Sequence, residues 1–150
     1  MKPKVALLGL AAICLTGMAR AADAPNGLDV IALRQSGQAL VGGDFIGMLQ
    51  AAKNKLPDVK PFAPAALALA KWEKQFVQMF PPGSEHGDNT KALPAIWTNR
   101  AGFEKDAADL TTAAEKLADI AKAADRAGFA PQVKVVGEAC AACHKQFRAK

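Results

Sequence analysis

Residues 99–124 read NRAGFEKDAADLTTAAEKLADIAKAA, and this stretch indicates the fold class of the chain. Its apolar residues recur at spacings of three and four, while its charged residues fall on the other faces. This pattern is typical of an amphipathic α-helix with one buried face. The apolar stripe consists of Phe103, Ala107, Leu110, Ala114, Leu117, Ala121 and Ala124. We therefore predict a helix from about Asn99 to Ala124.

Three further segments show the same periodicity, from about Asp29 to Lys53, Phe62 to Met79, and Ala130 to Ala149. Alanine occupies 33 of 150 positions and there is no tyrosine, which favours helices over an all-β fold. Four helices with mostly short connections predict an all-α, up-down-up-down four-helix bundle.

The connections carry helix-breaking residues. Gly128 is expected to end the third helix, and Pro131 suits the first turn of the last one. The one long connection runs from Phe80 to Leu93 and begins Pro81-Pro82-Gly83.

Glycine is frequent in the predicted first helix, at Gly37, Gly42, Gly43 and Gly47. Each costs about 1 kcal/mol relative to alanine. Two interpretations stay open: a marginal or kinked helix, or close approach by something flat or by a partner helix.

The first 21 residues resemble a secretory signal peptide. Lys2 and Lys4 precede the uncharged run 5–17, and Ala19-Arg20-Ala21 follows as a small-x-small cleavage site. The uncharged run is shorter than the roughly 20 residues of a membrane span. We predict that residues 1–21 are removed and that residues 22–150 form one exported domain.

Removing the signal peptide changes the charge of the chain. The net charge of the whole chain is +5, but Lys2, Lys4 and Arg20 belong to residues 1–21, which contain no acid. The remaining 16 basic and 14 acidic residues leave +2. This small excess does not support binding to nucleic acid.

The cysteine count also changes. Cys14 lies in the apolar part of the signal peptide, and Ile13 before it is a poor fit to a lipidation site. The exported domain keeps Cys140 and Cys143, in an oxidising compartment where free thiols seldom persist.

Residues 140–144 read CAACH, which is the C-x-x-C-H signature of c-type haem attachment. Each thiol can add to one porphyrin vinyl group and form a thioether. On a helix, positions i, i+3 and i+4 share a face, so His144 projects beside both sulfurs and can reach the iron. The motif predicts one haem c, held covalently by Cys140 and Cys143, with His144 as an axial iron ligand.

Other uses of two cysteines remain as alternatives. A thioredoxin-like dithiol expects a βαβ context, which this segment lacks. A structural zinc site needs four ligands, and only Cys140, Cys143, His144 and His86 are on offer. A haemless bundle with a Cys140–Cys143 disulfide is the remaining possibility.

The bundle topology predicts which residues meet the haem. In an up-down bundle the end of the fourth helix lies level with the start of the first. Arg34 and Gln38 are the two polar residues on the core stripe of the first helix. Either they snorkel at the bundle end, or they contact the haem, with Arg34 on a propionate and Gln38 opposite the iron. The long connection lies at the same end and is expected to cover the haem edge.

The chain resembles the class II cytochromes c, the cytochrome c′ group of bacterial periplasmic proteins. The resemblance covers nearly the whole exported chain. It rests on Arg34-Gln35-Ser36, on Phe80 to Ser84 with Gly87-Asp88, on Ile96-Trp97, and on Cys140 to Arg148 behind three helices.

The resemblance implies a left-handed four-helix bundle in the periplasm, often a homodimer, with one covalent haem. It matches Cys140 and Cys143 to the thioether cysteines and His144 to the proximal ligand. It also places Arg34 near the propionates, Arg148 beside the proximal face, and Phe76 on the distal side. From the residues alone, Arg148 reads as a solvated helix-end arginine and Phe76 as ordinary core.

Gln38 departs from the family pattern, which the resemblance gives as an apolar residue or a ligating methionine. A neutral amide offers ferrous iron little. We therefore predict a five-coordinate, high-spin ferrous haem that binds CO and NO. The alternative is a low-spin carrier with Met79 as sixth ligand, or less readily His86.

The predicted function is one-electron transfer, binding of small gases, or both, with a redox partner that the sequence does not name. No Ser/His/Asp constellation is present, so we do not expect an enzyme. We also expect no membrane association after signal removal.

Overall fold

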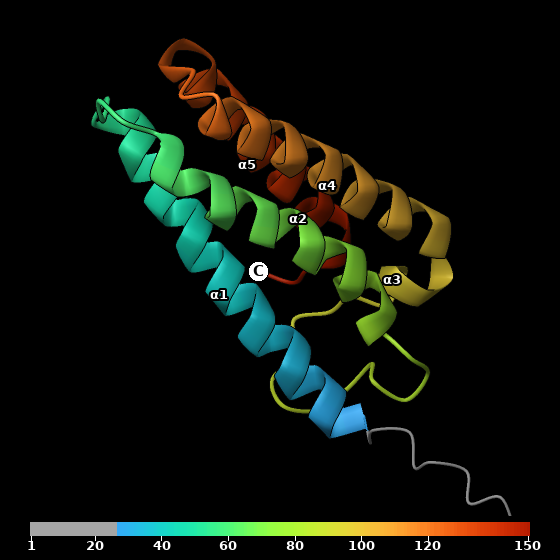
Figure 1. The fold of residues 1–150 in the computed structure, drawn as a ribbon. Coiled ribbons are helices and arrows are strands. Elements are labelled where there is room, and N and C mark those ends of the chain that lie inside the picture. Colours follow the sequence, from blue (N-terminus) through green and yellow to red (C-terminus); the bar gives the residue numbers. More distant parts are fainter. Residues whose placement is uncertain (1–26) are drawn as a thin grey trace, which may run out of the picture.

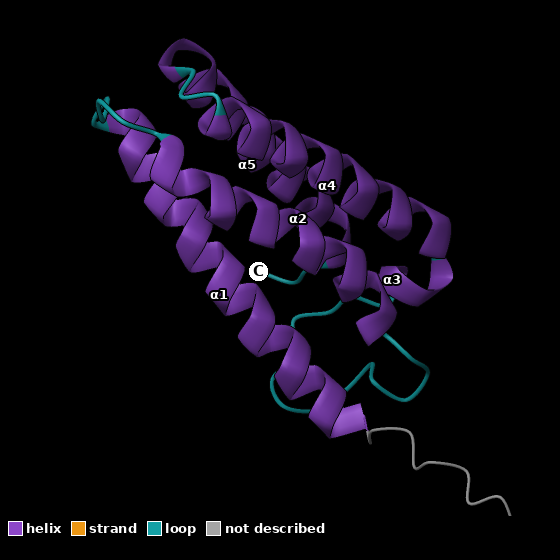
Figure 2. Cartoon of the chain, in the orientation of Figure 1, coloured by secondary structure: helices purple, strands orange, loops and turns teal. Residues whose placement is uncertain are grey.

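The computed structural model describes residues 27–150, and the predicted signal peptide with Cys14 lies outside this part. Five α-helices follow one another along the chain (Figure 1). They are α1 (Gly27–Lys53), α2 (Ala63–Phe76), α3 (Ala95–Thr98), α4 (Arg100–Lys122) and α5 (Arg126–Phe147). Short 3₁₀ turns, Lys60–Phe62 and Val77–Met79, flank α2. Figure 2 shows helices and loops throughout the described residues, without a strand.

The four long helices form an antiparallel bundle. α1 packs against α2 and α5, and α4 packs against the same two helices, so each long helix has two neighbours (Figure 1). This arrangement confirms the predicted all-α four-helix bundle. α3 is a single turn of four residues, too short to show a periodicity in the sequence.

α4 has the clearest sequence pattern and occupies the predicted place. Its stripe is buried from Phe103 to Ala121, with Phe103 and Leu117 at most 1% exposed, whereas Ala124 lies beyond the helix and is exposed. The Asn99 side chain accepts a hydrogen bond from the Gly102 N–H and so caps the first turn. α4 ends at Lys122, two residues before the predicted end.

The connection between α4 and α5 differs from the prediction. Gly128 does not end a helix; instead Ala124, with φ 56°, terminates α4, and Asp125 caps α5 by accepting from the Gly128 N–H at 2.9 Å. α5 therefore begins at Arg126, four residues early, and Pro131 lies inside it rather than in its first turn. Asp125 sets the start of α5 because its side chain satisfies a free N–H in the first turn of the helix.

The apolar core has two parts. A large cluster fills the middle and the far end of the bundle, where Met48, Leu117, Phe129 and Val133 are almost fully buried. A smaller cluster at the other end contains Phe80, Ile96, Phe103 and Phe147, with Cys143 packed against it. We call these the far end and the site end.

Gly37 permits close contact between α1 and α2. A Cβ atom at this position would lie 2.0 Å from Cη2 of Trp72, so only glycine leaves room for the indole. Gly42, Gly43 and Gly47 have nothing within 4 Å of such an atom. The close-approach interpretation is therefore correct for Gly37, and Trp72 is the flat group.

Within residues 27–150, no helix combines the length and the apolar character needed to cross a membrane.

Candidate functional site

The long connection and the C-terminus meet at the site end. The Leu93 N–H donates to the Phe147 carbonyl at 3.0 Å, and the Ala149 N–H donates to the Lys91 carbonyl at 2.8 Å. Ala92 and Arg148 form an isolated antiparallel bridge between these bonds. The end of α5 is thereby tied to the segment that follows α2.

α5 places Cys140, Cys143 and His144 on neighbouring turns at this end. Both cysteines are half-buried and free, and His144 is exposed. Cys140 packs against the large core cluster and Cys143 against the aromatic one. The two thiols therefore sit at the junction of the two clusters, facing the interior.

Both thiols stay protonated at neutral pH. Burial, and then the Glu73 charge, raise the pKa of Cys140 to about 11. Burial, and then Asp106, Glu73 and Cys140, raise the pKa of Cys143 to about 12. A redox-active dithiol needs a lowered pKa, so this environment disfavours the thioredoxin-like alternative.

A metal site built from side chains alone also lacks support. Across residues 27–150, no three His, Cys, Asp or Glu side chains come together closely enough to hold a metal ion. Two thiols and one imidazole on a single helix face are instead the donor set that C-x-x-C-H offers to haem.

His144 is set to be neutral. Partial burial, and then the positive charge of Arg148, lower its pKa. A neutral imidazole has a lone pair free for a metal. Arg148 lies just beyond the end of α5 and is exposed, and its N–H donates to the His144 carbonyl at 3.2 Å. The structure thus brings these two predicted site residues together.

Arg34 is buried, with 3% of its surface exposed, so it does not snorkel. Its terminal nitrogens donate to the Met79 carbonyl, to the hydroxyl and carbonyl of Ser84, and to the Thr90 hydroxyl, at 2.8–3.0 Å. The guanidinium also lies over the Phe80 ring at 4.3 Å. Arg34 therefore anchors the long connection to α1, a role that the sequence did not suggest. Its pairing with a propionate stays a prediction.

Gln38 is half-buried and donates a hydrogen bond from Nε2 to Oε1 of Glu73 at 3.0 Å. Glu73 is 5% exposed, and burial raises its pKa to about 7. Sequence reasoning missed Glu73. Glu73 was not among the apolar residues of the stripe predicted for this helix, although it lies four residues after Leu69 and three before Phe76, a spacing that places it on the same buried face.

Unsatisfied polar atoms occur around the aromatic rings where the two core clusters meet. Among the described residues, three buried side-chain atoms lack a partner: Nε1 of Trp72, Nε1 of Trp97 and Oδ2 of Asp106. A buried donor without an acceptor costs about 1–3 kcal/mol. Two free indole N–H groups fit a cofactor that carries acidic groups, as haem does with its propionates. The residues present therefore fit a haem.

Phe76 is half-buried in the aromatic cluster. Its ring centroid lies 5.0 Å from that of Phe80 and 6.2 Å from those of Trp72 and Phe103. This packing agrees with the core interpretation, and a distal role stays a prediction. Met79 is half-buried at the same end, whereas Met48 is buried in the far cluster.

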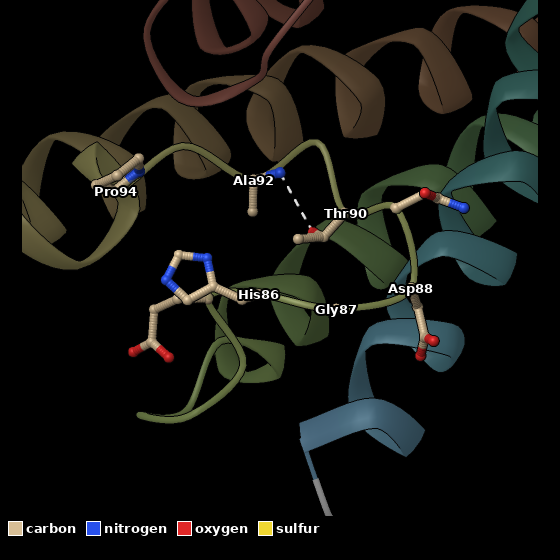
Figure 3. Close-up of a pocket in the computed structure, with 8 residues that line it drawn as sticks. His86, Gly87, Asp88, Thr90, Ala92 and Pro94 are labelled. Atoms are coloured by element: carbon tan, nitrogen blue, oxygen red, sulfur yellow. Dashed lines mark hydrogen bonds between the residues drawn. The ribbon is translucent and has the colours of Figure 1, made fainter.

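His86 is exposed and lines an open pocket of about 590 Å³ on the long connection. Figure 3 shows its imidazole beside Thr90, Ala92 and Pro94, with Asp88 pointing away. The pocket is lined by residues 85–94 of the connection and includes neither Gln38 nor Glu73.

Comparison with known proteins gives concordant results. The family described as Cytochrome C′ matches residues 29–148. Cytochrome c′ of Rubrivivax gelatinosus is 33% identical over 123 residues, which cover 81% of this chain and 95% of the relative. Cytochrome c-556 of Agrobacterium tumefaciens (strain II Chrys) is 36% identical over 112 residues, 73% of this chain and 88% of the relative.

Solved structures agree. The crystal structure of the Rubrivivax gelatinosus cytochrome c′ has a TM-score of 0.76 at 32% identity, covering 83% of this chain and 98% of that one. A nitric oxide complex of a variant cytochrome c prime from Alcaligenes xylosoxidans has a TM-score of 0.75 at 28% identity, covering 84% and 98%. The chain belongs to the cytochrome c′ family, whose members carry haem c and transfer electrons or bind gases.

Proposed function

We propose that the protein is a periplasmic monohaem cytochrome that transfers single electrons, binds small gases such as NO and CO, or does both. Cys140 and Cys143 hold the haem through thioethers, and His144 is the axial iron ligand. The observation that carries the proposal is the placement of both thiols, protonated and half-buried, at a bundle end with free indole donors.

Haem supplies one iron atom that changes between ferric and ferrous states and can bind a ligand at an open axial position. The chain supplies the rest. α5 orients His144 and both thiols from one rigid helix, and Phe76, Phe80 and Phe103 form the aromatic cluster against which Cys143 packs. The connection anchored by Arg34 covers this end of the bundle.

For the axial position opposite His144, we propose that Gln38 lines the pocket without ligating iron. The amide is neutral and its Nε2 is engaged with Glu73, so it gives ferrous iron no strong ligand. The ferrous iron is then five-coordinate and high-spin, and open to CO and NO. Met79 is the competing ligand, since it lies at the same end.

Two spectra of the purified holoprotein test this. A c-type pyridine haemochrome that resists acid-acetone extraction is expected; a colourless protein from a host with haem-attachment machinery would overturn the assignment. The reduced protein should be high-spin and shift on adding CO. A low-spin ferrous spectrum that resists CO and becomes high-spin in Met79→Leu would identify Met79 as the ligand.

We further propose a homodimer formed through the outward face of α1. Leu33 and Leu40 lie seven residues apart on this face and are 54% and 74% exposed, and Gly43 and Gly47 beside them leave space for a second helix. Sedimentation should give a dimer for the native protein and a monomer for Leu40→Glu. An unchanged dimer in that variant would exclude this face.

No catalytic role is proposed for the chain. Its chemistry lies in electron exchange and ligand binding at one iron, with a redox partner protein and gaseous ligands as the expected partners.

A further inference from the structure

Glu73 is a buried acid that forms no ion pair with any other residue of the range 27–150. It lies on α2 with 5% of its surface exposed. Its Oε1 accepts a hydrogen bond from Nε2 of Gln38 at 3.0 Å. Removing a carboxylate from water is costly unless it is paired with a positive charge. Such a residue in the interior of a bundle calls for a functional explanation.

The groups around Glu73 provide no compensating charge. α1 contributes the neutral Gln38, and the Arg34 guanidinium one turn earlier is occupied by Met79, Ser84 and Thr90. The neighbouring helices present Asp106 of α4 and the two cysteines of α5 at this end, and the guanidinium of Arg100 of α4 is occupied by Glu104 and the Val77 carbonyl. On α2 itself, Lys74 pairs with Glu115 at the surface.

The carboxyl group is close enough to the attachment cysteines to act on them. Its charge contributes to the raised pKa of both thiols, Cys140 and Cys143. In a low-dielectric interior, neighbouring charges interact strongly. Once both thiols are thioethers they no longer titrate, and Glu73 is left as the buried acid beside the cofactor.

Resting on the proposed function, we propose that Glu73 is the proton acceptor coupled to reduction of the haem iron. One electron from an external one-electron donor converts ferric to ferrous iron. One proton from solvent converts the Glu73 carboxylate to the carboxylic acid. The buried site then gains no net charge on reduction.

The sign follows from electrostatics. Reduction lowers the positive charge at the iron, so a nearby carboxylate becomes easier to protonate and its pKa rises. Burial already holds the pKa of Glu73 at about 7, with Gln38 pulling it down. At pH values between the pKa of Glu73 in the oxidised protein and its higher pKa in the reduced protein, reduction takes up a proton. The reduction potential therefore falls as pH rises through this interval. Above and below that interval it is independent of this group.

Gln38 tunes this coupling. Its N–H stabilises the ionised carboxylate, so its removal raises the pKa of Glu73 and moves the coupled interval to higher pH. The same hydrogen bond fixes the amide, so the distal side presents Gln38 and Glu73 as one connected pair.

The test is a spectroelectrochemical titration of the holoprotein from about pH 5 to about pH 9, a range that brackets a raised carboxyl pKa. The native protein should show an interval in which the equilibrium constant for reduction falls, by up to about tenfold per pH unit for one coupled proton. Glu73→Gln should abolish this interval and hold the potential at the high, low-pH level. Gln38→Leu should keep the interval and move it to higher pH.

A reduced-minus-oxidised infrared difference spectrum gives an independent readout. A band of a buried protonated carboxyl should appear on reduction in the native protein and be absent in Glu73→Gln. Glu115→Gln is the matched control because it removes an acid of equal size from the surface of α4, and it should leave both band and interval intact.

The outcomes separate the two proposals. A haem-containing native protein with a pH-independent potential, or an interval that survives in Glu73→Gln, would overturn the role of Glu73 and leave the haem assignment standing. Absence of covalent haem in the same samples would overturn both.

Discussion

The two ends of the bundle bury different kinds of side chain. At the far end, Met48, Phe129 and Val133 fill an apolar core with at most 1% of their surface exposed. At the site end, Arg34, Glu73 and Ser84 are buried polar residues, and the indole N–H of Trp97 has no partner among the described residues. The site end has buried polar atoms that no other described residue of the chain satisfies.

The apolar far end therefore contributes mainly to stability, and the site end carries the polar residues proposed for function. Apolar packing stabilises in proportion to the area removed from water, while buried polar groups cost free energy unless they are paired. Arg34 meets that cost with four hydrogen bonds, whereas Glu73 does so with a single one from a neutral amide. We therefore expect substitutions at the two ends to differ in kind.

The largest effect is expected at the attachment cysteines. The double variant Cys140→Ser, Cys143→Ser leaves no sulfur for a thioether, so all covalent haem should be lost. Acid-acetone extraction and the pyridine haemochrome measure this. Ala141→Ser, at an exposed position between the cysteines, is the control and should retain the haem. Retention of unextractable haem in the double variant would show that the attachment residues lie elsewhere.

Phe129→Ala tests the far end. Phe129 is 1% exposed and packs against Phe62 with tilted rings, whose centroids lie 5.8 Å apart. Truncating a buried phenylalanine costs about 3–5 kcal/mol of unfolding free energy. Denaturant unfolding should show this loss while the haem spectrum stays unchanged. A changed spectrum would mean that the two ends are not independent.

Glu73→Gln should stabilise the protein, and only at higher pH. The pKa of Glu73 is raised from 4.5 to about 7, so the folded state holds this proton more tightly than the unfolded state. The stability that this bound proton contributes is fully present below pH 4.5 and is lost as pH rises through 7. At pH 8 the glutamine variant should gain up to about 3 kcal/mol over the native protein, and little at pH 4. Equal gains at both pH values in thermal unfolding would contradict this account.

Arg34→Met should loosen one segment more than the whole. It leaves the acceptors on Met79, Ser84 and Thr90 without their donor, at a cost of about 2 kcal/mol. Hydrogen exchange should speed up in residues 80–93 and stay slow in α4. Uniform acceleration across all helices would show that Arg34 supports the bundle rather than the connection.

The smallest effect is expected at the start of α5. Asp125→Ala removes the side-chain acceptor of the Gly128 N–H and should cost about 1 kcal/mol, without spectral change. Asp125→Asn, which keeps a capping oxygen, should recover most of this loss. Failure of asparagine to do so would argue against the cap.

Periodicity predicted the four long helices because each buries one continuous stripe, and it placed Arg34 and Gln38 on the interior side of α1 correctly. It failed where local capping decides, since Asp125 rather than Gly128 sets the start of α5. It also missed pairings between distant segments. The Gln38–Glu73 hydrogen bond joins residues 35 positions apart, and no local pattern in either helix predicts that these two side chains pair.

The hydrogen bonds of Arg34 have a consequence for the order of folding. They join residues 45 to 56 positions apart, whereas the α4–α5 hairpin brings together segments joined by a tight turn. Contacts of long sequence separation form slowly because a large loop must close first. We expect the α4–α5 hairpin to assemble first, with Cys140 and Cys143 still reachable from solvent. The connection then closes beside Cys143, so covalent attachment has an interval of time in which a bulky planar group can enter.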